Sequence, residues 1–135
     1  AQLGMQRGRW LKKLKKEGKF QLKDRTITIE EVGYVKKGLK IVYTGDTRPH
    51  KNIALLAKEA DVLIHDGTFL EEDVKGKYHS DVKKAAEIAK AANVKKLVLT
   101  HISRRYTDVT ELEEQAKKIF PETIVARDMM KLMLK

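Results

Sequence analysis

Short apolar runs alternate with amphipathic segments along most of the chain. The apolar runs, which are typical of buried strands, occupy residues 39–43, 62–64, 96–99 and 124–125. Three stretches carry apolar side chains at helical spacing, and they lie at residues 52–60, 81–92 and 109–119. Strands that alternate with helices predict an α/β fold in which helices pack on a sheet.

Local signals refine the element boundaries. Asn52 is the expected N-cap of the first of these helices, and Ser80 is the expected N-cap of the second. The first helix is predicted to turn Ile53, Leu55 and Leu56 inward, and the second Val82, Ala85, Ala86, Ile88 and Ala89. Period-two alternation predicts a half-exposed strand over Thr26–Glu30, and a terminal strand with an apolar face is expected over Asp128–Leu134.

Charge is distributed unevenly. Residues 1–40 hold 12 Lys and Arg against 4 Asp and Glu, whereas residues 41–135 hold 17 against 15. A basic block segregated in this way favours a polyanionic partner. The chain has no cysteine, so any bound metal must use histidine and carboxylate ligands, which suit zinc or manganese. No apolar run reaches the roughly 18 residues of a membrane span, and no signal peptide is recognisable.

The basic block contains one helical pattern. Trp10, Leu11 and Leu14 share helical spacing with lysines between them, and Gly18 is expected to end the helix. Two interpretations stand: a solvated amphipathic helix packed through its Trp and Leu, or a clamp on a nucleic-acid backbone. The clamp would use Arg9, Lys12, Lys13, Lys15 and Lys16.

Polar side chains follow three of the predicted strands. Asp46 comes after a strand and the turn at Gly45, His65 and Asp66 end the next strand, and His101 follows a third. Because an α/β sheet builds sites where its strands end, these side chains are expected to form one site along one edge. The alternative is that each is only a turn residue that caps its strand.

These residues have the chemistry that phosphodiester hydrolysis needs. Asp46 has two oxygens that can bridge two metal ions, and His101 offers a neutral imidazole ligand. Histidine is the side chain that ordinarily changes charge near neutral pH, so His79 could give a proton to a leaving group, oriented by Asp66. Arg105 is a bidentate donor for phosphate. A capped histidine, a turn aspartate and a surface arginine are the simpler alternatives. His50 is interpreted as exposed and non-catalytic, and turn or supporting hydroxyls are expected at Thr44, Thr47 and Thr68.

Four ordered motifs resemble the C-terminal half of ribonuclease Z, the tRNA 3′-processing endoribonuclease of the metallo-β-lactamase fold. The motifs are Gly45-Asp-Thr-Arg-Pro49, Ile64-His-Asp-Gly-Thr-Phe69, His79-Ser-Asp81 and Leu99-Thr-His-Ile-Ser-Arg-Arg-Tyr106. The resemblance implies the C-terminal half of an αββα sandwich over residues 21–135. It also implies that residues 1–20 are the distal part of a protruding, basic tRNA-binding arm.

The resemblance assigns roles residue by residue. Asp46 resembles the carboxylate that bridges two zinc ions, and His101 resembles a ligand of the second zinc; manganese is the alternative metal. His79 resembles the histidine that assists departure of the 3′ oxygen, with Asp66 as its partner where the family usually has Glu. Arg105 resembles a phosphate-binding arginine. Asp81 stands where the family usually has Thr, which affects how His79 is held.

One departure concerns completeness. The His-x-His-x-Asp-His motif of the family is absent, and a two-metal centre needs about seven or eight ligands. The expectation is therefore a fragment of a cytoplasmic, zinc-dependent endoribonuclease that removes the 3′ trailer of precursor tRNA and is inactive by itself. Its expected partners are precursor tRNA and either a second copy, as a homodimer, or the missing N-terminal half of the same protein. The alternatives are another metallo-β-lactamase-fold phosphodiesterase or hydrolase, and a nucleic-acid-binding module without catalysis.

Overall fold

The structure is a computed structural model that describes residues 8–34, 36–74 and 78–134. The chain divides into two compact units, Ala1–Gly38 and Leu39–Lys135. The division expected between residues 20 and 21 falls inside strand β1 (Lys19–Leu22), which packs with α1 (Arg9–Glu17) in the first unit. Residues 1–7 of the predicted basic arm and the side chain of Arg9 lie outside the described part.

The first unit is a helix packed on a hairpin. Helix α1 buries Leu14 and is followed by β1 and β2 (Arg25–Thr28), which pair antiparallel. Gly18 adopts a left-handed φ of 73° and donates its N–H to the Leu14 carbonyl at 2.9 Å, so it ends α1 as predicted. The strand expected over Thr26–Glu30 is wrong at its end, because the chain turns into the short helix α2 (Ile29–Val32).

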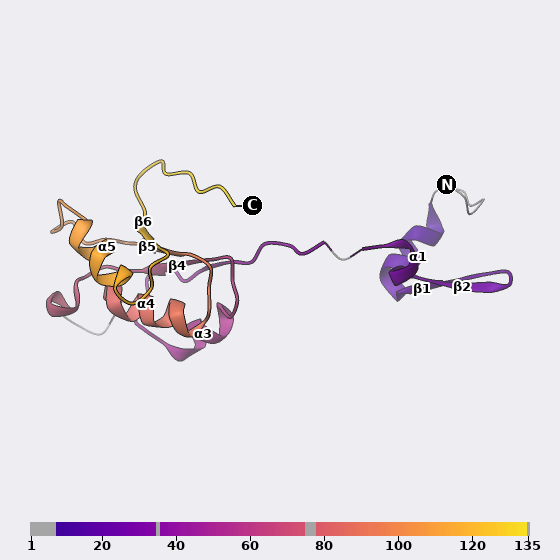
Figure 1. The fold of residues 1–135 in the computed structure, drawn as a ribbon, viewed down its shortest axis with the longest axis horizontal. Coiled ribbons are helices and arrows are strands. Elements are labelled where there is room, and N and C mark those ends of the chain that lie inside the picture. Colours follow the sequence, from indigo (N-terminus) through magenta and orange to yellow (C-terminus); the bar gives the residue numbers. More distant parts are fainter. Residues whose placement is uncertain (1–7, 35, 75–77, 135) are drawn as a thin grey trace. The chain divides into compact units, whose positions relative to one another are not determined.

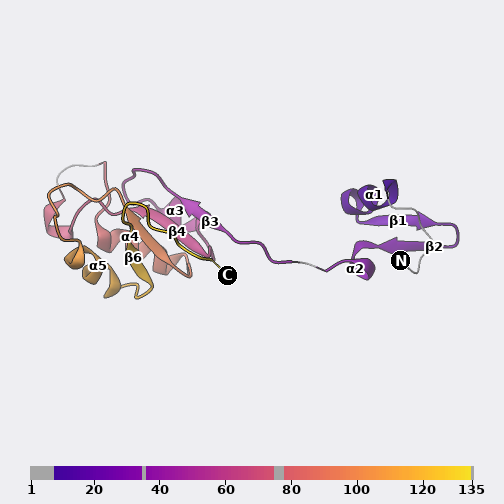
Figure 2. The same cartoon turned by 90° about the horizontal axis from the view of Figure 1, so that it is seen from above.

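The second unit is a four-stranded parallel sheet with helices on one face, as Figures 1 and 2 show. Its strands lie in the order β3, β4, β5, β6. These strands span Ile41–Tyr43, Val62–Asp66, Leu97–Thr100 and Thr123–Val125. The helices are α3 (Lys51–Leu56), η1 (Glu71–Asp73), α4 (Val82–Ala91) and α5 (Thr110–Lys117).

The core lies between the sheet and the helices. Register pairs place Leu63, Leu97 and Thr123 on one face, and all three are fully buried. Helix α4 covers this face with alanines, whose small side chains let the helix approach the strands closely. Burial of each large aliphatic side chain contributes about 1.5–3 kcal/mol. The predicted inner stripe of α4 is confirmed, with Val82, Ala85, Ala86 and Ala89 buried and Ile88 partly buried.

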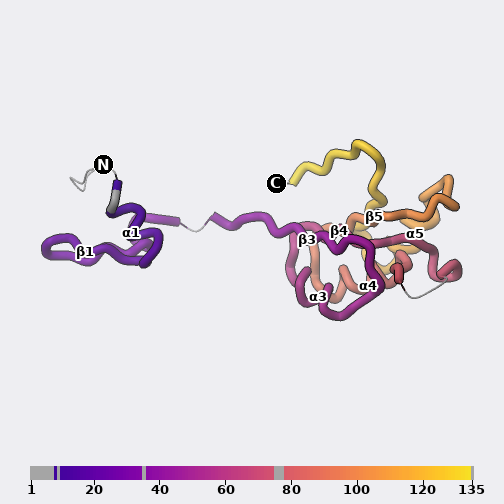
Figure 3. Tube along the Cα trace, turned by 180° about the vertical axis from the view of Figure 1, so that it is seen from behind, coloured from indigo at the N-terminus to yellow at the C-terminus, as the bar shows by residue number. Residues whose placement is uncertain are grey.

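The other face of the sheet is covered less. On this face of the edge strand β3, Ile41 is 55% exposed and Tyr43 is 66% exposed. The strand predicted over Asp128–Leu134 is wrong, since these residues form no regular element and pair with no strand of the described chain. Figure 3 traces this segment away from β6. Its Met129 and Met133 are 92% and 84% exposed.

Two predicted helix starts are corrected. Helix α3 begins after His50, whose Nδ1 accepts the Asn52 N–H at 3.1 Å, so His50 is the cap and Asn52 is inside the helix. Because α3 is short, only Ile53 and Ala54 face the core, and the prediction that Leu55 and Leu56 point inward is wrong. Helix α4 is capped by Asp81, whose carboxylate accepts the Lys84 N–H at 2.8 Å, instead of by Ser80. Every helix in the described residues is too short or too polar to traverse a bilayer.

Candidate active site

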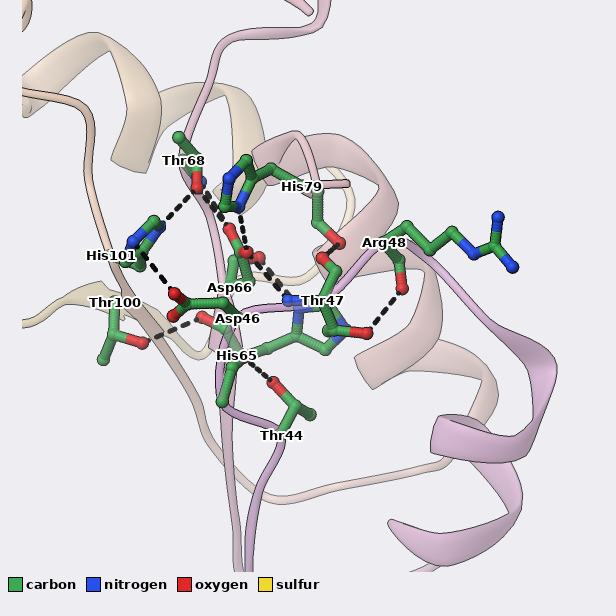
Figure 4. Close-up of polar contacts among 12 residues, drawn as sticks. Thr44, Asp46, Thr47, Arg48, His65, Asp66, Thr68, His79, Thr100 and His101 are labelled. Atoms are coloured by element: carbon green, nitrogen blue, oxygen red, sulfur yellow. Dashed lines mark hydrogen bonds and ion pairs between the residues drawn. The ribbon is translucent and has the colours of Figure 1, made fainter. Parts of the chain in front are cut away.

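The predicted site residues gather where β3, β4 and β5 end. Parallel pairing aligns the C-terminal ends of these strands, so Asp46, Asp66 and His101 reach one edge of the sheet. Gly45 has a left-handed φ of 64°, which turns the chain after β3 and presents Asp46. His79 joins them from the loop before α4, as Figure 4 shows.

Asp66 is a buried carboxylate with a complete set of donors. Its Oδ2 accepts the Thr47 N–H at 3.0 Å and lies 3.0 Å from His79 Nδ1. Its Oδ1 accepts the N–H of Thr68 at 3.0 Å and the Thr68 hydroxyl at 2.5 Å. Burial acts to raise the pKa of Asp66, but the hydrogen bonds from Thr68, His79 and Thr47 outweigh it, and the pKa lies below its ordinary value. Asp66 is therefore ionised at neutral pH.

His79 is held from three sides. Nδ1 faces Asp66, and the ring stacks on His101 with centroids 4.9 Å apart and planes 19° apart. The Phe69 and His79 rings meet in a T-shaped arrangement with their centroids 6.2 Å apart. The neighbouring Ser80 donates its hydroxyl to the Thr47 carbonyl at 2.8 Å, which ties this loop to the segment after β3. With Nδ1 bonded to an acceptor-only carboxylate, Nε2 is the nitrogen left for proton transfer.

His101 stands in a strained backbone conformation between two partners. Its φ is 58°, a left-handed value that is uncommon for residues other than glycine and recurs at functional sites. Nδ1 lies 2.9 Å from the Thr68 hydroxyl oxygen, and Nε2 lies 3.2 Å from Asp46 Oδ2. Asp46 and His101 are 58% and 42% exposed in their side chains, so this pair opens to solvent.

The donor set at this edge fits a metal ion. Ligand atoms of Asp66, His79 and His101 lie within 4.8 Å of one another. Both Asp66 oxygens, however, are already occupied by protein donors, so an ion there would have to displace them. Asp46 and His101 instead turn a carboxylate oxygen and an imidazole nitrogen toward the same solvent-exposed space, and oxygen and nitrogen ligands suit zinc or manganese.

Arg105 and the loop after β4 flank this cluster. The Arg105 guanidinium lies 5.3 Å above the Phe69 ring and 3.5 Å from an Asp73 oxygen, with 43% of its side chain exposed. Phe69 and Tyr106 end two of the sequence motifs, but neither was predicted to have a role in the site. The Phe69 ring contacts both His79 and Arg105. The Tyr106 hydroxyl accepts the Leu70 N–H at 3.0 Å and donates to Asp73.

His65 does not join the site. It lies on β4 one residue before Asp66, but its ring is fully buried and Nδ1 lies 2.8 Å from the Asp66 carbonyl oxygen. Nε2 has no partner within the described residues, and burial lowers the pKa of His65, so the ring stays neutral. His50 is exposed, as predicted, and its nitrogen caps α3.

The predicted phosphate-binding lysines lie in the first unit. Lys12, Lys13, Lys15 and Lys16 are all exposed on α1, and Lys13 lies 3.9 Å from Glu17. Leu14 is buried beneath them, and the Trp10 ring lies 6.4 Å from that of Phe20. The helix therefore packs through its apolar side and presents its lysines to solvent. This arrangement agrees with both sequence-based interpretations, a packed amphipathic helix and a cationic clamp on nucleic acid.

Comparison with known proteins identifies the family. The β-lactamase superfamily domain matches residues 12–102. This chain belongs to the β-lactamase superfamily. Its fold is that of the metallo-β-lactamase proteins: it resembles YhfI from Bacillus subtilis, a metallo-β-lactamase-fold protein, with a TM-score of 0.59 and 29% identity over 64% of this chain and 36% of that one. The predicted fold class is thus confirmed.

Within the superfamily, the similarity to ribonuclease Z extends over nearly the whole chain. Ribonuclease Z from Archaeoglobus fulgidus is 48% identical over 136 residues, which cover 97% of this chain and 44% of that protein. Ribonuclease Z from Saccharolobus solfataricus is 41% identical over 94% of this chain and 44% of its own length. The structure of human tRNase Z, short form, matches with a TM-score of 0.52 and 31% identity over 78% of this chain and 35% of that one. The predicted resemblance is confirmed, and the chain spans less than half the length of these curated relatives.

Proposed function

We propose that this superfamily member forms part of a metal-dependent endoribonuclease that cleaves precursor tRNA at its 3′ side. The observation that carries the proposal is the convergence of Asp46, Asp66, His79 and His101 at one sheet edge. The 48% identity to a ribonuclease Z supports it. The metallo-β-lactamase fold supports a metal cofactor. Zinc is our proposal for its identity, with manganese as the alternative, because the available ligands are nitrogen and oxygen.

The roles follow from the contacts. Asp46 and His101 would hold the metal, which when bound supplies a nucleophilic water and polarises a phosphoryl oxygen. Asp66 keeps a proton on His79 Nδ1, so His79 in its protonated form can give its Nε2 proton to the departing 3′ oxygen. Arg105, which also contacts Phe69, can bind the phosphate through its exposed guanidinium.

The exposed lysines of α1 are proposed to bind the tRNA backbone. Each lysine that neutralises a phosphate adds to the salt dependence of binding, so removing contacts should flatten it by about one unit of slope per contact. We expect the Lys12→Ala, Lys13→Ala, Lys15→Ala, Lys16→Ala variant to bind precursor tRNA more weakly and with a lower slope. A matched control replaces Lys83 and Lys84 of α4, which pair with Glu71 and Glu87. If the control lowers the slope as much per replaced lysine as the α1 variant does, α1 is not the binding surface.

Ligand number supports the proposal that these 135 residues alone are inactive. The described residues supply two solvent-open ligands, Asp46 and His101, whereas a catalytic zinc ordinarily has three protein ligands. We propose that the remaining ligands come from another part of the parent protein. The incompletely covered sheet face that carries Ile41 and Tyr43 gives such a part, or a second copy of the chain, an apolar surface to pack against.

A chimera tests the function. This chain replaces the matching 44% of the Archaeoglobus fulgidus ribonuclease Z, and cleavage of precursor tRNA is measured with zinc. The chimera is expected to cleave, whereas its Asp46→Ala and His101→Ala variants are expected to lose activity by at least about 100-fold. His50→Ala is the matched control, because His50 is exposed at the start of α3 and lies outside the cluster. Full activity in either site variant would reject the site assignment, and an inactive parent chimera that binds zinc would reject the proposed function.

A further inference from the structure

The Thr68 hydroxyl connects the buried carboxylate to the second histidine. Its oxygen lies 2.5 Å from Asp66 Oδ1 and 2.9 Å from His101 Nδ1. Thr68 is 4% exposed, and its backbone N–H also bonds Asp66 Oδ1 at 3.0 Å. Figure 4 shows these contacts as a continuous line from Asp66 through Thr68 to His101.

A hydroxyl has one proton to donate, and the two contacts compete for it. The ionised Asp66 carboxylate has no proton and can only accept hydrogen bonds, as it does from the backbone N–H groups of Thr47 and Thr68. The Thr68 proton must therefore point to Asp66 at 2.5 Å, which leaves a lone pair of the hydroxyl oxygen facing His101 Nδ1. That oxygen can then only accept, so Nδ1 must carry a proton.

We propose that Thr68 is a positioning residue that fixes His101 in the Nδ1–H tautomer and so turns the lone pair of Nε2 toward Asp46. Asp66 thereby fixes the Nδ1–H tautomer of both stacked imidazoles. It acts on His79 by direct contact at 3.0 Å and on His101 through the threonine hydroxyl. Histidine ligands are ordinarily oriented by a hydrogen bond from the ring nitrogen that does not bind the metal.

The alternative tautomer of His101 also has a hydrogen-bond partner. Nε2–H could donate to Asp46 Oδ2 at 3.2 Å instead. The two contacts differ in environment: the Thr68 contact is shielded, with the threonine 4% exposed, whereas the Asp46 side chain is 58% exposed. Leaving a shielded acceptor unsatisfied costs more than leaving a solvated one unpaired, so the part-buried contact with Thr68 decides the tautomer.

The consequence is a face-to-face pair of acceptors. In the Nδ1–H tautomer, the Nε2 lone pair and an Asp46 oxygen lie 3.2 Å apart with no proton between them. Such a pair attracts a cation, either a proton or a metal ion. This consequence rests on the metal site proposed above, whereas the tautomer rests only on the contacts of Thr68.

Imidazole ¹⁵N spectra of the full chain test the assignment, because they report which ring nitrogen carries the proton. They are recorded without metal at about pH 9, well above the ordinary histidine pKa of about 6.5. His101 of the unaltered chain is expected in the Nδ1–H form. In Thr68→Val, which keeps the side-chain shape but has no hydroxyl, the tautomer ratio should move toward Nε2–H by at least about tenfold. Thr68→Ser should restore the original ratio.

Two controls separate tautomer control from general disturbance. Thr100→Val makes the same change next to His101, at a hydroxyl that contacts the His65 carbonyl oxygen at 3.4 Å instead of the ring; it should leave the ratio unchanged. His79 should keep its Nδ1–H form in every variant, because Asp66 contacts it directly. If Thr68→Val fails to fold, the unaltered chain and Thr68→Ser still decide.

The outcomes are distinct. An Nε2–H tautomer in the unaltered chain, or no change in a folded Thr68→Val variant, overturns the proposal. A zinc titration followed on the His101 ring should show about 10- to 100-fold weaker binding in Thr68→Val than in Thr68→Ser. An inactive chimera together with an Nδ1–H His101 would reject the endoribonuclease and keep the tautomer assignment, and the reverse result would reject the assignment alone.

Discussion

Replacing Asp66 with asparagine tests whether this buried carboxylate stabilises the fold, in contrast to the exposed carboxylate of Asp46 in the same site. Each Asp66 oxygen accepts two hydrogen bonds, one from a backbone N–H of Thr47 or Thr68. In Asp66→Asn, the amide NH₂ replaces one oxygen, so in either orientation one backbone N–H faces a donor. An unsatisfied buried donor costs about 1–3 kcal/mol, and the loss of charge-assisted bonds adds to it. We expect about 2–4 kcal/mol of destabilisation.

The assay is urea unfolding followed by circular dichroism at 222 nm, with the slope m compared between variants. Asp46→Asn is the matched control: its carboxylate is 58% exposed and has one described partner, His101, so the change should stay below about 0.5 kcal/mol. A loss below about 0.5 kcal/mol in Asp66→Asn, or equal losses in both variants, would refute the hydrogen-bond argument.

Three further outcomes are expected. Because the folded-state pKa of Asp66 is lowered, its contribution is present above the ordinary value of about 4 and is lost as pH falls through the folded-state pKa. The difference in unfolding free energy between the unaltered chain and Asp66→Asn should therefore shrink below about pH 4. Gly67→Ala should destabilise the second unit by about 1–3 kcal/mol in urea unfolding, since a Cβ there would lie 3.0 Å from Leu99 Cδ2. Gly18→Ala should destabilise the first unit by about 1 kcal/mol in unfolding followed by Trp10 fluorescence, because φ is 73°.

Several features of the fold could be predicted because their causes are local. The apolar runs that became β3, β4 and β5 are buried or half-buried strands whose hydrophobicity needs no partner to be recognised. The alanine stripe of α4 and the glycine that ends α1 likewise follow from helical spacing and backbone freedom. The predictions failed where the structure of a segment depends on what packs against it. Residues 128–134 have strand-like composition, but no strand of the described chain lies beside them. Leu55 and Leu56 belong to a helix that is too short to bury them.

The sequence by itself determined which side chains stand at the ends of parallel strands, and hence that Asp46, Asp66 and His101 share one edge of the sheet. Only the tertiary structure decided which role each of these side chains has in the site. Asp66 is enclosed and bonded by backbone donors, Asp46 is open to solvent, and Thr68 lies between Asp66 and His101. The reason is physical: burial and hydrogen-bond direction depend on contacts between residues 33 positions apart, which no local pattern of the chain encodes.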